Sequence, residues 1–239
     1  MTALKVNLFM HLLELLAAVS ASYYWLKTRD EGIRPFVWYL WFIVFIETIA
    51  MYPYLYEYMS HDLQNWFYNS KICRNSWLFN FYDPIAVFLL GKFIILNTQL
   101  KRTHLAIRGL SFGFLFFAIL FYVLENDFFA TNMEIPMLVS ALVIIVMVVF
   151  YLLEMLKSER IIDLKKSHVF LLLIALAIWY ACVSPMFIFN GYYNMAYPRF
   201  VEFRIGLLVI LNKILYTYYI LVFIYTLRNK VLELKAEKS

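Results

Sequence analysis

The chain has 239 residues, of which 64% are hydrophobic and only 15% are charged. A water-soluble domain is usually about 45–50% apolar, so this composition excludes an ordinary soluble protein and indicates a membrane protein. The formal net charge is +5. Lysine and arginine in short loops orient membrane proteins, so this charge predicts a lipid bilayer as the partner rather than nucleic acid.

Seven apolar segments follow one another along the chain, each long enough to cross a bilayer as a helix. They cover residues 7–26, 36–56, 77–97, 105–124, 135–156, 169–190 and 203–227. The first segment contains His11 and Glu14, so we interpret it as a retained span rather than a cleaved signal peptide. We therefore predict one all-α integral membrane domain, residues 1–239, folded as a seven-transmembrane-helix bundle.

The longest connection, residues 57–76, lies between the second and third segments and is rich in aromatic residues. Its length allows a short helix at the membrane surface. Aromatic side chains at this place are typical of an interfacial belt, and a second interpretation is that they wall an outward-facing pocket.

Basic residues are distributed unequally between the two sides of the predicted bundle. The connections after the first, third and fifth spans and the C-terminal tail hold 13 lysines and arginines, whereas the opposite side holds Lys5, Lys71, Arg74 and Arg199. By the positive-inside rule, this distribution predicts an external N-terminus and a cytoplasmic C-terminus. An odd number of spans agrees with that orientation.

Several polar residues interrupt the apolar segments, and charged groups at such depth usually face the bundle interior or a water-filled cavity. His11 and Glu14 are three residues apart and share one helix face, and Glu47 and Asp83 lie at a similar outer depth. Lys213 lies near the middle of the last span. We predict a polar core, open to the outside, in which Lys213 pairs with one of the three acids; its members are His11, Glu14, Glu47, Asp83, Asn212, Lys213 and Tyr216.

A purely structural role is the alternative for this polar core. Glu14 and Glu47 could be protonated and hydrogen-bonded between helices. Asp83 is followed by Pro84, and Asp-Pro also occurs at the start of a helix, so the third helix could begin there.

Motifs of known catalytic chemistry are missing from the sequence. There is no HExxH, GxSxG or Walker motif, and the two cysteines, Cys73 and Cys182, lie in different settings. We therefore predict a protein that is not an enzyme, without a disulfide, a metal site or a resident cofactor.

Two resemblances bear on these expectations. The seven spans, Lys213 in the last span, and Trp179, Tyr180 and Pro185 in the sixth resemble microbial rhodopsins in architecture. That resemblance implies retinal bound to Lys213 as a Schiff base, but Val209 and Asn80 stand where rhodopsins carry an acid and an arginine. Fold alone does not imply function.

A second resemblance covers nearly the whole chain. The runs HLLELLAAVSASYYW, RPFVWYLWFIVFIETIAMY, NSWLFNFYDPIAVFLLGKF, LLEMLKSERIIDLKK and CVSPMFIF resemble a group of uncharacterised small seven-span membrane proteins of Bacteroidota. The resemblance implies a multi-pass protein of the bacterial inner membrane and no assigned chemistry.

The leading hypothesis is a non-enzymatic sensor or receptor-like signalling subunit. Its outward polar core would bind an unknown small ligand or respond to protonation, and its short basic cytoplasmic loops would dock a signalling partner. The alternatives are a retinal-binding photoreceptor or pump through Lys213, and a transporter or membrane-complex scaffold.

Overall fold

A computed structural model describes residues 3–125, 128–157, 167–189 and 198–236. Within these ranges the chain forms eight α-helices and one short 3-10 helix, and no strand. In chain order they are α1 Ala3–Thr28, α2 Arg34–Ala50, η1 Tyr52–Tyr58, α3 His61–Asn69, α4 Ser76–Leu96, α5 Lys101–Leu124, α6 Glu134–Leu156, α7 His168–Ile188 and α8 Pro198–Ala236.

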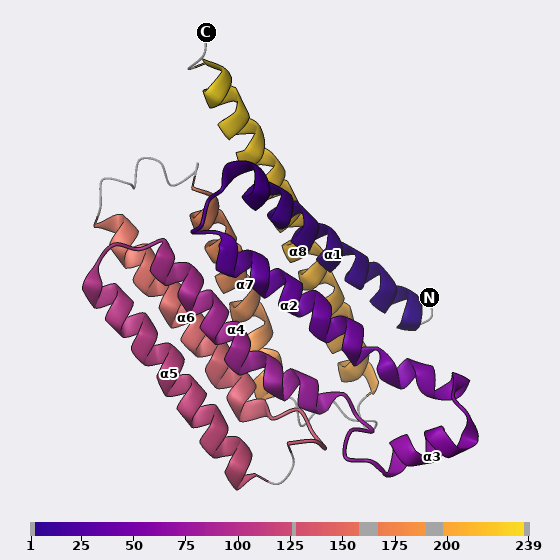
Figure 1. Ribbon diagram of the computed structural model, residues 1–239. Helices are drawn as coiled ribbons and strands as arrows, with labels where there is room; N and C mark the ends of the chain where they lie inside the picture. Colours follow the sequence, from indigo (N-terminus) through magenta and orange to yellow (C-terminus); the bar gives the residue numbers. More distant parts are fainter. Residues whose placement is uncertain (1–2, 126–127, 158–166, 190–197, 237–239) are drawn as a thin grey trace.

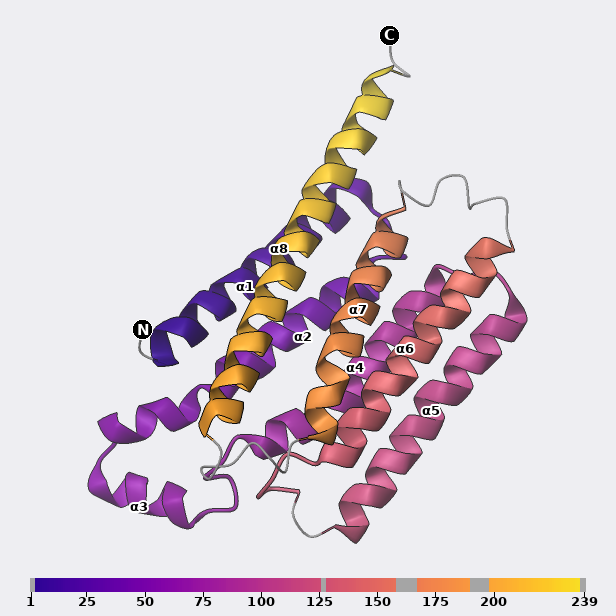
Figure 2. The same cartoon turned by 180° about the vertical axis from the view of Figure 1, so that it is seen from behind.

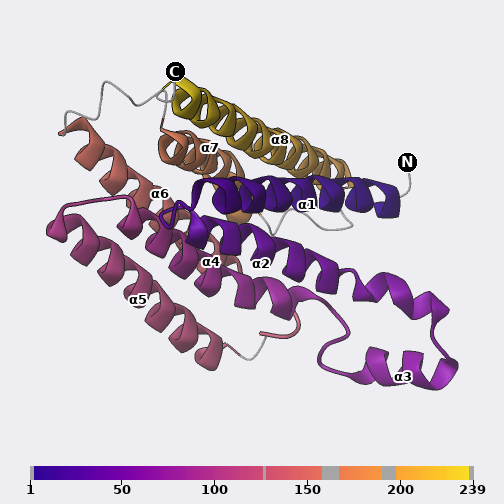
Figure 3. The ribbon, with the colours of Figure 1, turned by 45° about the horizontal axis from the view of Figure 1, so that its top comes forward.

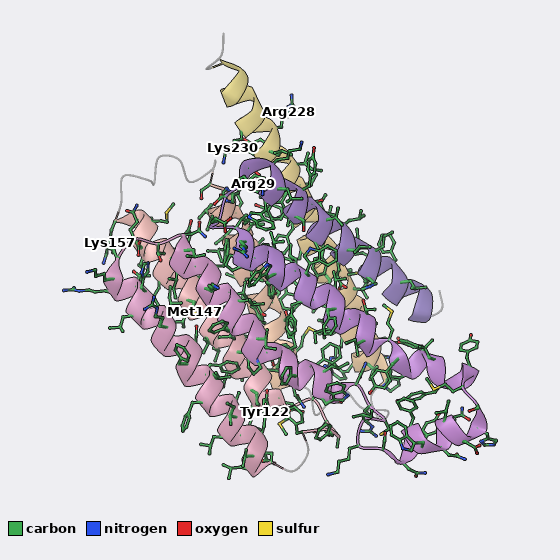
Figure 4. The ribbon with its side chains drawn as sticks, viewed as in Figure 1. Arg29, Tyr122, Met147, Lys157, Arg228 and Lys230 are labelled. Atoms are coloured by element: carbon green, nitrogen blue, oxygen red, sulfur yellow. The ribbon has the colours of Figure 1, made fainter. Side chains whose placement is uncertain are left out.

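The long helices run alternately up and down (Figure 1). We name one end of the bundle the α3 end, after the short helix that lies there. We name the other the basic end, because the labelled side chains of Arg29, Lys157, Arg228 and Lys230 gather there (Figure 4). The N-terminus lies toward the α3 end and the C-terminus projects from the basic end (Figure 1).

Six of the helices close into a ring. Neighbours pack in the order α1, α2, α4, α6, α7, α8 and back to α1, while α5 packs on α4 and α6 from outside. Figure 2 shows α6, α7 and α8 side by side from behind, and Figure 3 shows α5 at the edge of the bundle. The ring therefore encloses an interior to which all of its six helices can contribute side chains.

In the part of the chain that the structure describes, six helical segments are long and apolar enough to cross a membrane, and α1 is not among them. They are Arg34–Tyr56, Ser76–Leu96, Lys101–Leu124, Glu134–Leu156, His168–Ile188 and Pro198–Lys230. At 26 residues, α1 is about 39 Å long at 1.5 Å per residue, so its length alone would allow a crossing. The chain is thus a helical bundle with several membrane-span candidates.

The described parts of the predicted segments are largely helical, and the second segment, residues 36–56, agrees with the span candidate Arg34–Tyr56. Within that span the α-helix α2 ends at Ala50 and the 3-10 helix η1 begins at Tyr52, because Pro53 lacks the N–H that would continue α2. The last helix has 39 residues instead of 25, since its charged and polar ends are compatible with a helix although they are not apolar. The long connection after the second segment, which the sequence allowed to hold a short helix, contains α3.

Aromatic side chains fill the ring on its basic-end half. Phe36 on α2 is completely buried, and its ring centroid lies 5.0 Å from that of Phe93 and 5.3 Å from that of Tyr219. Phe223 on α8 lies 6.3 Å from Phe36. We name Phe36, Phe93, Tyr219 and Phe223 the aromatic floor, because they close the interior toward the basic end.

A small side chain allows α4 to pack closely on α5. A Cβ atom built on Gly91 would lie 2.5 Å from Ser111 Oγ and 3.5 Å from Met147 Sδ. Gly113, by contrast, has nothing within 4 Å of such an atom. Any side chain at Gly91 therefore has to push α4 and α5 apart or move the serine.

At the basic end, the turn after α1 is tied to the start of α7. His168 Nε2 lies 3.3 Å from Asp30 Oδ2, and the Gly32 amide donates to Asp30 Oδ1 at 2.9 Å. The hydroxyl of Tyr24 lies 3.4 Å from His168 Nδ1. The imidazole of His168 holds the pKa of Asp30 below its usual value of 3.8, so the carboxylate form is the one that this contact stabilises.

Candidate functional site

A cavity of about 320 Å³ lies inside the ring, in the half toward the α3 end. We name it the inner cavity. Its walls come from α2, α4, α6, α7 and α8 together with the loop before α6. The lining residues with a polar or charged group are Glu47, Tyr82, Asp83, Asn132, Ser140, Trp179, Tyr180, Arg204, Asn212 and Tyr216. At the opposite end of the ring, the aromatic floor closes the interior.

Among the described lining residues, two oxygen atoms have no hydrogen-bond partner. Asp83 is 8% exposed, and its Oδ2 is buried without a partner. Asn132 Oδ1 is also buried without a hydrogen-bond partner. Buried polar atoms in folded proteins are nearly always hydrogen-bonded, so these two acceptors are available to a donor that enters the inner cavity.

Asn80 positions the loop that carries Asn132. Its side-chain amide donates to the carbonyls of Phe128 at 2.7 Å and Thr131 at 2.9 Å. Its Oδ1 accepts from the Met133 amide at 2.9 Å. These contacts bracket Asn132 on both sides, and Asn80 stands one helical turn before Asp83 on α4. One side chain of α4 thus places the loop residue in the same cavity as the acid.

A second cavity of about 280 Å³ adjoins the first on the side of α1. We name it the α1 cavity. His11 and Glu14 line it, and it shares Glu47 and Asn212, together with Phe79 and Leu208, with the inner cavity. The two cavities are therefore neighbours separated by these shared side chains.

The polar pair of the α1 cavity is linked to α2. His11 Nδ1 lies 3.2 Å from Glu14 Oε2, and His11 Nε2 lies 3.1 Å from Thr48 Oγ1. The single Thr48 hydroxyl hydrogen donates to the Val44 carbonyl, so His11 Nε2 has to donate to Thr48. The hydrogen bond between His11 and Glu14 then contains one proton that either residue can hold.

A third, more open depression of about 530 Å³ lies beside the inner cavity at the α3 end. We name it the vestibule. Its lining includes Arg74, Glu125 and Glu134, and it shares Asn132 and Arg204 with the inner cavity. These two side chains stand between the vestibule and the inner cavity.

Hydrogen bonds fix several walls of the inner cavity. Trp179 Nε1 on α7 donates to Asn212 Oδ1 on α8 at 2.8 Å. The hydroxyl of Tyr82 on α4 donates to that of Tyr39 on α2 at 3.2 Å. The Tyr82 ring also stacks on Phe42, with centroids 5.7 Å apart. Hydrogen bonds therefore join neighbouring helices around the cavity, in addition to the packing of their side chains.

The structure brings together six of the seven residues predicted for the polar core. His11 and Glu14 line the α1 cavity, Asp83 and Tyr216 line the inner cavity, and Glu47 and Asn212 line both. Pro84 lies inside α4, so the idea that the third helix begins at Asp83 is wrong.

Lys213 is the exception, and the pairing predicted for it is wrong. Its side chain is exposed, and Nζ lies 5.2 Å from the centroid of the Phe9 ring. No ion pair joins it to Glu14, Glu47 or Asp83, all of which the structure describes. Side chains that face the ring on α8 recur at Asn212, Leu215, Tyr216 and Tyr219, a helical stripe that position 213 does not share.

Sequence reasoning missed several residues of the site. Asn132 lies in a connection, where polar residues are common, and Asn80 was noted only for its position before Asp83. Trp179 and Tyr180 were taken as part of a resemblance rather than as cavity walls. Their spacing from Val183 and Phe187, which also line the inner cavity, is the helical periodicity that could have shown one face of α7.

Cys73 and Cys182 are free, and among the described residues no group of three His, Cys, Asp or Glu side chains has the arrangement of a metal site. No protein-family model, no curated protein and no solved structure matches the chain. The fold and the site together define an all-helical bundle with membrane-span candidates around buried polar cavities.

Proposed function

We propose that the protein is a non-enzymatic membrane receptor or signalling subunit that binds a small ligand in the inner cavity. The observation that carries this proposal is the pair of unpartnered acceptors, Asp83 Oδ2 and Asn132 Oδ1, in a cavity lined by aromatic side chains. Ligand sites are typically apolar pockets of roughly 300–1,000 Å³ with a few polar groups that fix orientation. The inner cavity, at about 320 Å³, lies at the small end of that range.

The proposed topology has seven spans, with α1 as the first of them, in a bacterial inner membrane. The α3 end and the N-terminus face outward, and the basic end faces the cytoplasm. Support comes from the basic side chains Arg29, Lys157, Arg228 and Lys230 at one end (Figure 4), which is the pattern of cytoplasmic surfaces. In this orientation the vestibule opens outward and the basic end is available to a cytoplasmic partner.

Cysteine labelling in intact cells tests the proposal. In a Cys73→Ser, Cys182→Ser background, Met137→Cys places a thiol in the inner cavity. The matched control, Ile119→Cys, places one on the outer face of α5, where Ile119 is 54% exposed. A charged, membrane-impermeant thiosulfonate reagent reacts with thiolates in water, so we expect it to label position 137 from outside and to leave position 119 unlabelled.

A third variant, Asp62→Cys on α3, reports whether the α3 end is outside. If position 62 is labelled while position 137 of the folded protein is not, the inner cavity is not accessible and the receptor proposal is wrong. If positions 62 and 137 are labelled only in inverted vesicles, the proposed orientation is wrong.

Retinal binding is a less well supported candidate, because Lys213 lies outside the two cavities and over Phe9. A Schiff base at this lysine would place the chromophore against the bundle surface rather than among the aromatic side chains of the inner cavity. We expect no visible absorption band after all-trans retinal is added to the purified protein. A band that Lys213→Ala removes would reverse this conclusion. No feature of the described residues favours a transporter or a scaffold over the receptor.

A further inference from the structure

The chemistry of the inner cavity restricts what it can bind, provided that it is the ligand site proposed above. Its two unpartnered atoms, Asp83 Oδ2 and Asn132 Oδ1, are both suited to accept hydrogen bonds. A ligand that satisfies them has to bring N–H or O–H donors. A protonated amine brings up to three donors and a positive charge on one small group.

The charges that line the cavity agree with a cation. Carboxyl groups come from two sides, Glu47 on α2 and Asp83 on α4, whereas Arg204, the one basic residue among the described lining residues, is shared with the vestibule. An anionic ligand would have to approach both carboxyl groups. A cation placed beside Asp83 compensates a buried carboxylate, which is otherwise costly to keep in an apolar interior.

The remaining walls suit an apolar body and an ammonium group together. Aromatic rings line the cavity from α4, α7 and α8, and they belong to Phe79, Tyr82, Trp179, Tyr180, Phe187 and Tyr216. The face of an aromatic ring attracts a cation, and tryptophan and tyrosine do so well. The same rings bury an aromatic or branched aliphatic substituent.

We propose that the inner cavity binds a small organic amine, with its ammonium group between Asp83 and Asn132 and its apolar body against Trp179, Tyr180 and Tyr216. The vestibule is the access route, and Asn132 and Arg204 stand where the ligand enters. The α1 cavity lies on the far side of Glu47 and Asn212 and is not part of this binding site.

Three probes of one skeleton test the ligand class on the purified full-length protein in detergent. They are 2-phenylethylamine, its uncharged counterpart 2-phenylethanol, and the anion phenylacetate. We expect the amine to raise the thermal unfolding midpoint with increasing concentration, since a ligand that binds only the folded state stabilises it. The alcohol and the anion should have little effect at the same concentrations.

Asp83→Asn removes the charge while keeping the shape of the side chain. A hydrogen bond to a charged group contributes about 1.5–3 kcal/mol, so the substitution should weaken amine binding by about 10- to 100-fold in calorimetry. Asp62→Asn, on the exposed surface of α3, is the matched control and should bind as the wild type does. The comparison of the three probes on the wild type does not depend on whether the Asp83 variant folds.

The outcomes separate this inference from the proposed function. Binding of the alcohol or the anion in place of the amine overturns the ligand class and leaves the receptor proposal standing. Equal amine affinity in Asp83→Asn and wild type shows that the amine binds elsewhere and also overturns the inference. Cysteine labelling of the inner cavity needs no ligand, and it tests independently the access from outside that the proposed function requires.

Discussion

Asn80 offers the sharpest test of how the site is built. It is 1% exposed and makes three side-chain hydrogen bonds to the backbone of the loop before α6, at 2.7, 2.9 and 2.9 Å. Asn80→Ala removes all three and leaves two carbonyls and one amide without their partner. Each net hydrogen bond contributes about 0.5–1.5 kcal/mol, so for three bonds we expect a loss of about 1.5–4.5 kcal/mol in unfolding free energy.

Asn75→Ala is the matched control for this substitution. Asn75 is only half-buried and donates one hydrogen bond, to the Ala50 carbonyl at 3.0 Å. Its loss should cost about 0.5–1.5 kcal/mol. Both variants are compared with the wild type by chemical denaturation in detergent. A loss for Asn80→Ala no larger than that for Asn75→Ala would show that the loop does not depend on Asn80, and the argument for the placement of Asn132 would be refuted.

Two further predictions concern packing and pH. Gly91→Ala places a methyl group 2.5 Å from Ser111 Oγ and should lower the unfolding free energy by about 1–3 kcal/mol, whereas Gly113→Ala, with nothing within 4 Å, should raise it by up to about 1 kcal/mol. Equal effects in denaturation would contradict the close approach of α4 and α5. Because the pKa of Asp30 is lowered from 3.8 by His168, the stability that its carboxylate contributes is present above pH 3.8 and is lost as pH falls through the lower folded pKa. The thermal midpoint of the wild type should therefore exceed that of Asp30→Asn by more at pH 6 than at pH 3. A difference between the two midpoints that is larger at pH 3 than at pH 6 would refute this predicted pH dependence.

Hydropathy and length were sufficient to predict the long helices, because an apolar run of about 20 residues has few other ways to satisfy its backbone in a membrane. They did not predict where the last helix ends. The hydrophobic signal stops at residue 227, but a helix ends where its backbone hydrogen bonds end, and α8 continues to Ala236.

The polar core was predicted only in part, because the sequence gives the depth of a residue along its helix but not the side of the helix on which it lies. Depth along a helix can be counted from the sequence, so His11, Glu14, Glu47 and Asp83 were correctly expected in one half of the bundle. The direction in which a side chain points around the helix axis depends on which face of the helix packs inward. Asn212 and Lys213 are adjacent in sequence, yet one lines both cavities and the other lies over Phe9 on the outside.

Loop residues could not be placed from the sequence. Asn132 reaches the inner cavity only because Asn80, 52 positions earlier, holds the backbone on both sides of it. Such long-range contacts have no periodic signature.

The length of α8 has a mechanical consequence. Asn212 lines both cavities, and Lys230 lies 18 residues further along the same helix, which is about 27 Å at 1.5 Å per residue. A tilt of about 5° at the cavity would move the far end by about 2 Å, as a lever moves its tip. A small change in how Trp179 holds Asn212 would thus be amplified at Arg228 and Lys230, where the helix projects from the bundle.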